Sequence, residues 1–330
     1  MIEVATIIVN YRTAAATIEA VAALGKDLDQ LEEAMVVVVD NDSGDGSAER
    51  LHKEFSETRW NGRVVVVSSG RNGGFGSGVN VGVQYVLKSF GSPRYFYILN
   101  PDATIDPGTL NTLVSFMADH RDAGLLGNLV HNQQGGGVIG AFRFPSLLGE
   151  LEGTACLGLL SRLLRSHVVS INPSASCEVD WVSGVSMLFR SEVFSTVGFF
   201  DEAFFLYFEE IDFARRTRQA GWKTYFVADA GVGHIGALST GMSDASRRMP
   251  RYWFESRRRY FVKHHGRLYA AACDVAWLCG HAILRVKNSL PGKHETRRKN
   301  VGRDLLRFSL ANFLKPAPES AQSKANPTFR

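Results

Sequence analysis

Apolar and polar residues follow two different periods along the first 128 residues of the chain. Four short runs are apolar at nearly every position, namely Val4–Val9, Met35–Val39, Val64–Val67 and Tyr95–Leu99. Runs of this kind are typical of parallel strands that are covered on both faces. Apolar residues recur with helical spacing in the intervening stretches Ala14–Leu24, Ser47–Phe55 and Gly78–Leu87. Strands that alternate with helices predict an α/β fold with a mostly parallel sheet of the nucleotide-binding type.

Polar residues and glycines follow each predicted strand. Asn10 and Tyr11 follow the first strand, Asp40 follows the second, and the third leads into the glycine-rich loop Ser69–Gly78. Because the carboxyl ends of parallel strands meet at one edge of a sheet, where ligands bind, we expect a nucleotide pocket there. An acidic strand end can accept hydrogen bonds from a base or ribose, and a glycine loop lets the backbone approach a phosphate. The loop has neither the Gly-x-Gly-x-x-Gly pattern of dinucleotide-binding enzymes nor a Walker motif, so by itself it fits a tight strand-to-helix turn equally well.

The fourth predicted strand runs directly into Asn100-Pro101-Asp102. Pro101 cannot donate to a strand ladder, so the strand ends there and leaves Asp102 at the carboxyl edge. A carboxylate at this position suits a hard divalent cation such as Mg²⁺ or Mn²⁺, which prefers oxygen ligands. The alternative interpretation is that Asp102 caps a helix that starts near Pro107, or closes an Asx turn.

A second group of acids lies among aromatic residues in the stretch 200–216. Glu209, Glu210 and Asp212 begin a predicted helix that Gly221 is well suited to stop. Partial burial beside apolar side chains raises the pKa of a carboxyl toward neutral pH, which makes these acids candidate general bases. Acids at a helix start also stabilise the helix dipole, so capping is the alternative for each of them.

His234 lies in a glycine-flanked turn that follows a strand expected at Lys223–Val227. A lone histidine is more often structural, but next to Asp102 it would be a second metal ligand. Earlier in the chain, Trp181 and Gly184 precede an apolar stretch and could offer a flat face and a close backbone approach to a sugar. A buried core position is the alternative for the tryptophan.

The middle of the chain is less regular. The stretch Leu147–Arg165 is apolar and is predicted to form a helix or lid beside the pocket, and Gly135-Gly136-Gly137 is predicted to be a loop tip. The four cysteines contain no Cys-x-x-Cys pair, which argues against a zinc site and a disulfide framework. We therefore expect reduced packing cysteines and a cytoplasmic protein. The N-terminal sequence shows neither a signal peptide nor a membrane anchor.

Charge separates the last quarter of the chain from the rest. The 330 residues have a formal net charge of +4, and the basic residues crowd between Arg247 and Arg307, where they could contact nucleic acid, anionic lipid or water. The apolar stretch Leu268–Val286 is interrupted by Asp274, His281 and Arg285, so a spanning helix is not expected. From Pro316 onward the composition is that of a disordered end.

Several motifs occur in an order that resembles the family 2 inverting glycosyltransferases, and among them the bacterial rhamnosyltransferase-like branch that builds cell-surface polysaccharide. The motifs are Ile8-Val9-Asn10-Tyr11, Val39-Asp40-Asn41 with Ser43 and Asp45-Gly46-Ser47, Asn72-x-Gly74-Phe75-Gly76-x-Gly78-x-Asn80-x-Gly82, Leu99-Asn100-Pro101-Asp102, Ser183-Gly184, Phe208-Glu209-Glu210-x-Asp212, and His234 followed by Ser239-Thr240. Together they cover roughly residues 4–240. The resemblance implies the GT-A fold, a nucleotide-sugar donor of the dTDP or UDP type, and a divalent cation, Mg²⁺ or Mn²⁺.

The resemblance also implies roles for individual residues. Asp40 would hydrogen-bond the uracil or thymine ring, and Asp102 and His234 would ligate the metal. Glu210 occupies the position of the catalytic base. The donor would further contact Asn10, Tyr11, Asn72, Gly74, Asn80 and Asn100, and the acceptor would contact Trp181, Gly184, Glu209 and Asp212.

The sequence departs from the family pattern at two positions. Asn100 replaces the first acid of the metal motif, and Glu210 stands where aspartate is usual. One extra methylene moves a carboxylate, so Glu209 or Asp212 is an alternative base.

We expect a GT-A domain at 1–245, a basic amphipathic helical region at 246–315 and a disordered tail at 316–330. Under the resemblance, the acceptor is a glycan or a polyprenyl-diphosphate-linked sugar. The C-terminal helices would then lie on the inner face of the plasma membrane, and the alternatives are a helical hairpin packed on the core or a dimer contact.

L-Rhamnose from dTDP-L-rhamnose is the expected donor, and another nucleotide-sugar, such as a UDP-hexose or UDP-N-acetylhexosamine, is the alternative. A non-catalytic nucleotide- or carbohydrate-binding scaffold is the alternative of another class. Nucleic acid is not an expected partner.

Overall fold

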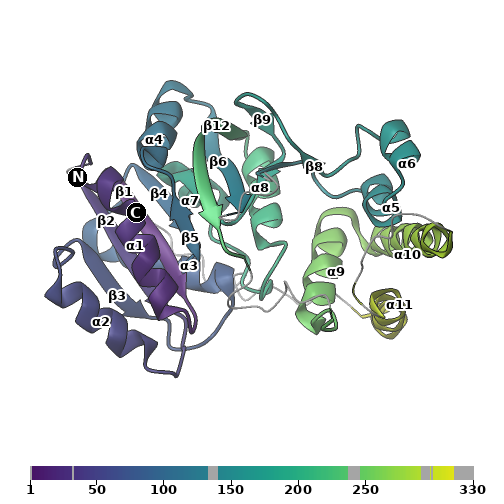
Figure 1. The fold of residues 1–330 in the computed structure, drawn as a ribbon, viewed down its shortest axis with the longest axis horizontal. Coiled ribbons are helices and arrows are strands. Elements are labelled where there is room, and N and C mark those ends of the chain that lie inside the picture. The colour runs from purple at the N-terminus through teal and green to yellow at the C-terminus, as the bar shows by residue number, and fades with distance from the viewer. Residues whose placement is uncertain are drawn as a thin grey trace.

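A computed structural model describes residues 2–31, 33–132, 140–236, 246–290, 298 and 300–315 of the chain. A sheet flanked by helices forms one end of the molecule, and a group of helices forms the other (Figure 1). The predicted loop tip Gly135-Gly136-Gly137, the Ser239-Thr240 pair and the tail 316–330 lie outside the described residues.

The central sheet has nine strands within these residues, in the order β3-β2-β1-β4-β11-β6-β12-β5, with β9 paired to β12. The strands are β1 (Val4–Asn10), β2 (Ala34–Asp40), β3 (Val64–Ser68), β4 (Tyr95–Leu99), β5 (Ala103–Ile105), β6 (Ala123–Asn132), β9 (Cys177–Val179), β11 (Ser186–Arg190) and β12 (Lys223–His234). Six of them, β1 to β4, β6 and β12, share one direction, whereas β5, β9 and β11 run opposite to their neighbours. The predicted α/β fold with a mostly parallel sheet is therefore confirmed. A small second sheet contains β10 (Trp181–Val182), β7 (Ala141–Phe142) and β8 (Ser170–Ile171).

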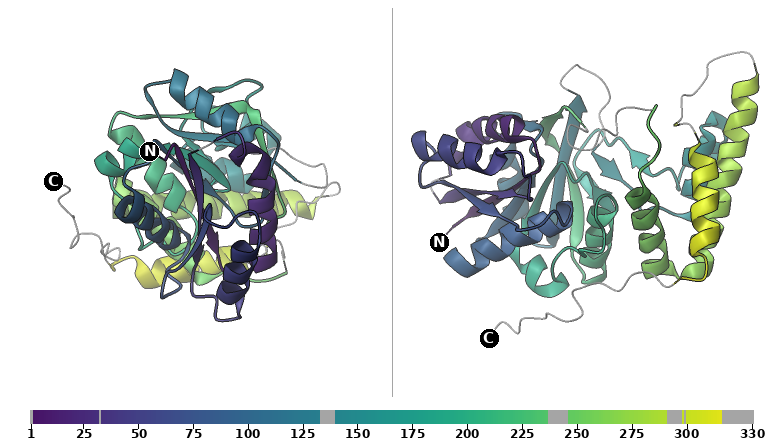
Figure 2. Two further views of the ribbon diagram at one scale, coloured as in Figure 1. Left: turned by 90° about the vertical axis from the view of Figure 1, so that its left-hand side faces the viewer. Right: turned by 90° about the horizontal axis from the view of Figure 1, so that it is seen from below.

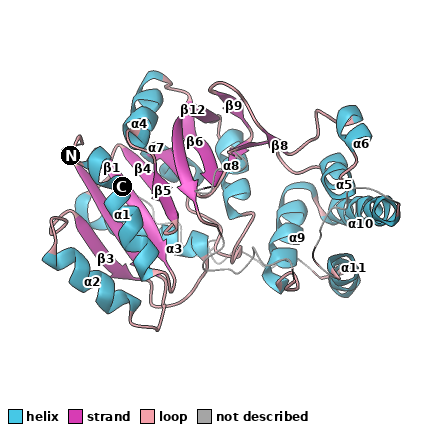
Figure 3. Ribbon diagram, in the orientation of Figure 1, coloured by secondary structure: helices cyan, strands magenta, loops and turns pink. Residues whose placement is uncertain are grey.

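The central sheet is apolar on both faces because its strands are apolar at successive positions. In β1, Ile8 packs on one face and Ile7 on the other. The first face is covered by α1 (Ala14–Leu28), α2 (Ser47–Glu57) and α4 (Thr109–Asp119). The second face is covered by α3 (Phe75–Phe90), α7 (Ser191–Val197), α8 (Glu209–Gln219) and α9 (Arg251–His265). Figure 3 shows the helices on either side of the strands.

Two predicted elements differ from the structure. The single helix expected at Leu147–Arg165 is two helices, α5 (Leu147–Ala155) and α6 (Gly158–Leu163), because Cys156 between them has a left-handed φ of 47°. His234 was predicted to lie in a turn, and this is wrong. β12 continues beyond the expected end at Val227, past an irregularity at Val227/Gly231, and His234 is its last residue.

The C-terminal helices are α9, α10 (Arg267–Ser289) and α11 (Val301–Asn312). Tyr260 and Phe261 of α9 are fully buried in the same core cluster as the sheet. Helix α10 packs on α5 so closely that a Cβ on Gly280 would lie 2.6 Å from the carbonyl oxygen of Leu151. Helices α10 and α11 lie side by side (Figure 2). Among the described residues, no helix is long and apolar enough to cross a membrane.

Candidate active site

A pocket of about 460 Å³ lies where the carboxyl ends of β1 and β4 approach the start of α8. Nine of the predicted site residues line it, namely Tyr11, Asn72, Gly74, Asn100, Asp102, Gly184, Glu209, Glu210 and His234. The other five predicted site residues do not line it, namely Asn10, Asp40, Asn80, Trp181 and Asp212. The structure thus gathers most of the predicted residues at one sheet edge.

Asp102 and His234 meet in this pocket from two different strands. Asp102 follows β4, and β12 pairs with β5 so that His234 is opposite Ala103. The Nε2 atom of His234 lies 3.1 Å from Oδ1 of Asp102. Asp102 does not cap the next helix, since the carboxylate of Asp27 accepts from the backbone N–H of Gly108 and Leu110 at the start of α4.

The donor atoms of this pair fit a divalent cation. Two ligands about 2.1 Å from a metal and at a right angle are about 3 Å apart, which is close to the separation of the two side chains. In the part of the chain that the structure describes, no group of three or more His, Cys, Asp or Glu side chains could hold a metal. The remaining ligands of a cation here would therefore be substrate oxygens and water, an arrangement that Mg²⁺ favours.

Asp40 and Asn10 lie beneath the pocket and bind each other. Oδ1 of Asp40 accepts from Nδ2 of Asn10 at 2.7 Å and from the Ser43 hydroxyl at 2.6 Å, and its Oδ2 accepts from the backbone N–H of Ser43. Both side chains are buried. Their hydrogen bonds fix the turn after β2, which places Asn41 in the pocket lining. The contact of Asp40 with a base stays a prediction.

The glycine loop is held by Asn72 and by a close approach of two backbones. Oδ1 of Asn72 accepts from Nδ2 of Asn41 and from the N–H of Gly74. Gly74 has a φ of 88°, and a Cβ there would lie 1.8 Å from the carbonyl oxygen of Phe205. Glycine is therefore required at this position by both conformation and space.

Asn80 anchors the segment that leads to α8. Its amide donates to the carbonyl oxygen of Phe200 and accepts from the N–H of the same residue, both at 2.9 Å. The side chain is buried away from the pocket. Asn80 thus fixes the course of the chain between the core and the acids at the start of α8.

Glu209 and Glu210, the first two residues of α8, face the pocket. Each has a buried Oε2 that makes no hydrogen bond within the described residues. Burial, together with the nearby charge of Glu210, raises the pKa of Glu209 well above its ordinary value. Burial also raises the pKa of Glu210 to about 7. A Cβ on Gly184 would lie 3.8 Å from Cγ of Glu210, in ordinary van der Waals contact, so Gly184 directly borders this side chain. A carboxyl with these properties can accept a proton near neutral pH.

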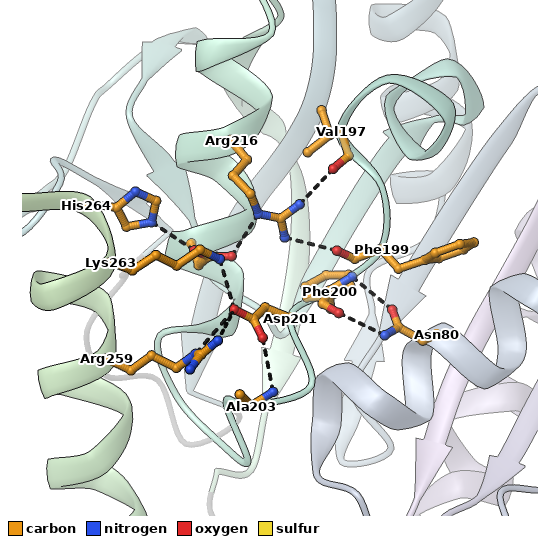
Figure 4. A network of polar contacts seen from close by, with 11 residues as sticks. Asn80, Val197, Phe199, Phe200, Asp201, Ala203, Arg216, Arg259, Lys263 and His264 are labelled. Carbon is orange, nitrogen blue, oxygen red and sulfur yellow. Dashed lines mark hydrogen bonds and ion pairs between the residues drawn. The ribbon is translucent and has the colours of Figure 1, made fainter. Parts of the chain in front are cut away.

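Asp212 belongs to a buried network instead. Its partners Arg216, Lys263 and His264 are labelled in Figure 4. Asp212 accepts from Arg216 at 2.8 Å, from Lys263 at 2.7 Å and from His264 at 2.8 Å. Burial opposes its charged form, but the His264 hydrogen bond and the charges of Arg216 and Lys263 outweigh this, so the pKa of Asp212 is well below its ordinary value. Lys263 also pairs with Asp201. The network joins α8 to α9.

Trp181 is in the core on the side of the small sheet. Its ring stacks on Phe142 at 4.0 Å, and its Nε1 donates to the carbonyl oxygen of Arg143. Phe205, Tyr207 and Tyr252 also line the pocket, although the sequence did not predict them as site residues. The crowding of aromatic residues before Glu209 was a signal for the first two, but nothing in the sequence connected Tyr252 with this site.

The mostly parallel sheet with a pocket at its carboxyl edge is that of a GT-A fold, and comparison with family models identifies the class of protein. The model of glycosyl transferase family 2 matches residues 6–168, and that of glycosyl transferase family group 2 matches residues 95–290. The chain belongs to glycosyl transferase family 2.

Individual relatives place the chain in the rhamnosyltransferase-like branch of this family. It is 30% identical over 224 residues to an N-acetylglucosaminyl-diphospho-decaprenol L-rhamnosyltransferase of Mycobacterium tuberculosis, covering 64% of this chain and 69% of the relative. It is 27% identical over 164 residues to the rhamnosyltransferase WbbL of Escherichia coli (strain K12), covering 47% of this chain and 58% of the relative. The predicted family and branch are confirmed.

Solved structures support the fold. A crystal structure of GalNAc-T7 with UDP, GalNAc and Mn²⁺ superposes with a TM-score of 0.58 at 15% identity, covering 96% of this chain and 58% of that chain. A mannosyltransferase of Pyrobaculum calidifontis in complex with GDP-Man and Mn²⁺ superposes with a TM-score of 0.53 at 16% identity, covering 96% and 81% of the two chains. The predicted GT-A fold with C-terminal helices is confirmed.

Proposed function

We propose that the protein transfers L-rhamnose from dTDP-L-rhamnose, with inversion, to a polyprenyl-diphosphate-linked sugar used in cell-surface polysaccharide synthesis. One observation carries the proposal. A single pocket contains the Asp102–His234 pair and two carboxyl groups with unpartnered oxygens at the start of α8. The rhamnosyltransferase activity for which the two relatives are named supports the choice of sugar, and the acceptor in the name of the mycobacterial relative supports the choice of acceptor.

Asp102 and His234 would hold Mg²⁺ or Mn²⁺, which neutralises charge on a departing nucleoside diphosphate when it is bound. Two of the structural neighbours contain Mn²⁺, which supports this assignment. Tyr11 and Asn41 would border the nucleoside, and the loop at Asn72 would border the diphosphate through its backbone.

Glu210 takes the proton from an acceptor hydroxyl as the hydroxyl oxygen attacks the anomeric carbon. The bond from that carbon to the diphosphate oxygen breaks on the opposite face, which inverts the configuration in one displacement. Glu209, whose carboxyl is adjacent, is the alternative base. Burial and the nearby charge of Glu210 raise the pKa of Glu209 well above the ordinary value, which favours its neutral form.

The C-terminal helices supply a surface for a lipid-linked acceptor. The side chains of Leu268, Val275, Ile283, Val286 and Leu290 are all exposed, and their spacing puts them on one face of α10 and its end. Arg285 of α10 and Arg303 and Arg307 of the neighbouring α11 are exposed as well. An exposed apolar stripe beside basic residues fits the surface of an anionic membrane, so we propose peripheral contact with the inner face of the plasma membrane.

Calorimetric titration of the protein with dTDP, UDP and GDP, each with and without Mg²⁺ or Mn²⁺, tests the donor. Metal-dependent binding of dTDP in preference to UDP, followed by rhamnose transfer to an N-acetylglucosaminyl-diphospho-polyprenol, is the expected result. Preference for UDP would replace the donor with a UDP-hexose or UDP-N-acetylhexosamine. If no nucleotide binds, the hypothesis of a non-catalytic scaffold remains and the proposed donor is excluded.

A further inference from the structure

Three aromatic side chains that form one cluster line the pocket and have no role in the scheme above. Phe205 and Tyr207 come from the segment before α8, and Tyr252 comes from the first turn of α9. The ring centroids of Phe205 and Tyr252 are 5.5 Å apart. Those of Tyr207 and Tyr252 are 6.3 Å apart, with the ring planes inclined by only 24°. The three rings, which we call the aromatic wall, form a continuous surface built from two distant parts of the sequence.

The aromatic wall is exposed to the pocket although its neighbours in sequence are core residues. Phe204 is fully buried and Phe208 is 9% exposed, whereas Phe205 between them is 39% exposed. Burial of Phe204 and Phe208 therefore anchors the segment, and the residues between them are left beside the pocket. An aromatic side chain in water forgoes much of the free energy that its burial would provide, so a cluster of such rings in a cavity indicates a ligand that covers them.

Backbone strain holds one of the three rings in place. Tyr207 and Phe208 have φ values of 68° and 69°, in the left-handed region that bulky side chains rarely adopt. Such a conformation is energetically unfavourable for a bulky residue and is typical of functional sites. The Phe208 ring packs against Trp253 and Tyr260 of α9, which stabilises the strained turn directly before Glu209 and Glu210.

The chemistry of the wall suits a sugar ring. A pyranose has faces made of C–H groups, which pack on an aromatic face through dispersion and the attraction of C–H dipoles to the π-electrons. The wall continues along the chain into Glu209 and Glu210, and a base must touch the hydroxyl of the acceptor. Tyr252 stands on α9, among the helices whose outer face fits a membrane. Both facts favour the acceptor sugar over the donor sugar as the ligand of the aromatic wall.

We propose that Phe205, Tyr207 and Tyr252 bind the sugar ring of the acceptor, and that Tyr252 makes the C-terminal helices part of the acceptor site. This inference rests on the proposed function. It extends that function by naming the residues that select a ring-shaped acceptor.

Calorimetry with a water-soluble, short-chain N-acetylglucosaminyl-diphospho-prenol analogue tests the wall without turnover. Replacing Tyr252→Ala is expected to raise the Kd of the analogue roughly 10- to 100-fold, the effect of losing an apolar contact of 1–3 kcal/mol in a binding pocket. Tyr252→Phe keeps the ring and is expected to stay within about threefold of the parent protein. The Kd of dTDP is expected to be unchanged in both variants.

Phe205→Ala provides a second variant, because Phe205 lies outside any helix and its loss does not shorten α9. Phe90→Ala is the matched control, since Phe90 is 50% exposed and does not line the pocket. The proposal is overturned if the parent protein does not bind the analogue, if Tyr252→Ala and Phe205→Ala bind it as tightly as Phe90→Ala, or if the variants weaken dTDP instead. Failure of the proposed function has a different signature, namely intact analogue binding without rhamnose transfer.

Discussion

The first turn of α8 contains acids of two opposite kinds. Glu209 and Glu210 face the pocket, have unpartnered carboxyl oxygens and have raised pKa values. Asp212, two residues further along, is fully buried, is paired with Arg216, Lys263 and His264, and has a lowered pKa. Under the proposed function, one short helix therefore contains both the residue for proton transfer and the residue for anchoring. Paired charge fixes the helix on α9, and unpaired carboxyls are left to meet a substrate.

Removal of the proton acceptor is expected to have the largest effect. Glu210→Gln keeps the size of the side chain but cannot take a proton, so kcat should fall by roughly 10²- to 10⁴-fold. The Kd of dTDP in the presence of Mn²⁺ should stay within about twofold. Steady-state kinetics and calorimetry measure the two quantities. Unchanged turnover would remove Glu210 as the base, and a comparable loss in Glu209→Gln alone would transfer the role to Glu209.

Loss of an anchoring charge is expected to act on stability. Asp212→Asn removes a fully buried carboxylate that accepts from Arg216, Lys263 and His264. Because Arg216 and Lys263 are partly exposed and Lys263 keeps its pair with Asp201, the loss should cost about 1–3 kcal/mol of unfolding free energy. Asp29→Asn is the matched control, because Asp29 is half exposed and pairs with Arg59 at the surface. This control should cost no more than about 1 kcal/mol. Urea denaturation measures both, and equal costs would contradict the distinction between the two kinds of acid.

Loss of one residue of the proposed metal pair is expected to have a smaller effect than Glu210→Gln. Asp102→Ala removes one of two protein ligands, while diphosphate oxygens and water would supply the others, so the metal-dependent part of dTDP affinity should fall roughly 10- to 100-fold. Binding of dTDP in EDTA should be the same in variant and parent. Calorimetry with and without Mn²⁺ separates the metal-dependent from the metal-independent part of dTDP binding. An unaltered metal titration would exclude Asp102 as a ligand.

Sequence periodicity was sufficient to predict most of the fold. The strand Tyr95–Leu99 has the predicted bounds, because a fully buried strand is apolar at every position and Pro101 ends it. The break at Cys156 could not be predicted, since the left-handed conformation there occurs at a residue that is neither glycine nor asparagine.

The sequence predicted pocket residues correctly where their place at the end of a strand is enough to bring them to the pocket. Asp102 and Tyr11 line the pocket because strand ends share an edge. Asp40 and Asn10 are also at strand ends, but they bind each other, and sequence alone cannot tell a polar pair from two ligand contacts. Tyr252 depends on how α9 docks against the chain before α8, which is a tertiary contact between residues about 45 positions apart.

The two kinds of acid should also give stability opposite dependences on pH. Asp212 has a lowered pKa in the folded protein, so its stabilising effect is present above its ordinary pKa and is lost as pH falls through acid values. Glu209 and Glu210 have raised pKa values, so the folded protein holds more protons than the unfolded chain between the ordinary value of 4.5 and about 7. Stability should therefore fall as pH rises through this window.

Glu209→Gln removes the charge that burial disfavours and should stabilise the free protein by roughly 1–3 kcal/mol at pH 8. The gain should vanish near pH 4, where the glutamate is neutral in both states. Thermal unfolding between pH 4 and 8 measures it, with the exposed Glu57→Gln as control. A gain in stability that did not depend on pH would mean that the substitution improves packing and does not act by removing a charge. The pocket acids would then not differ from Asp212 in the effect of their charge on stability.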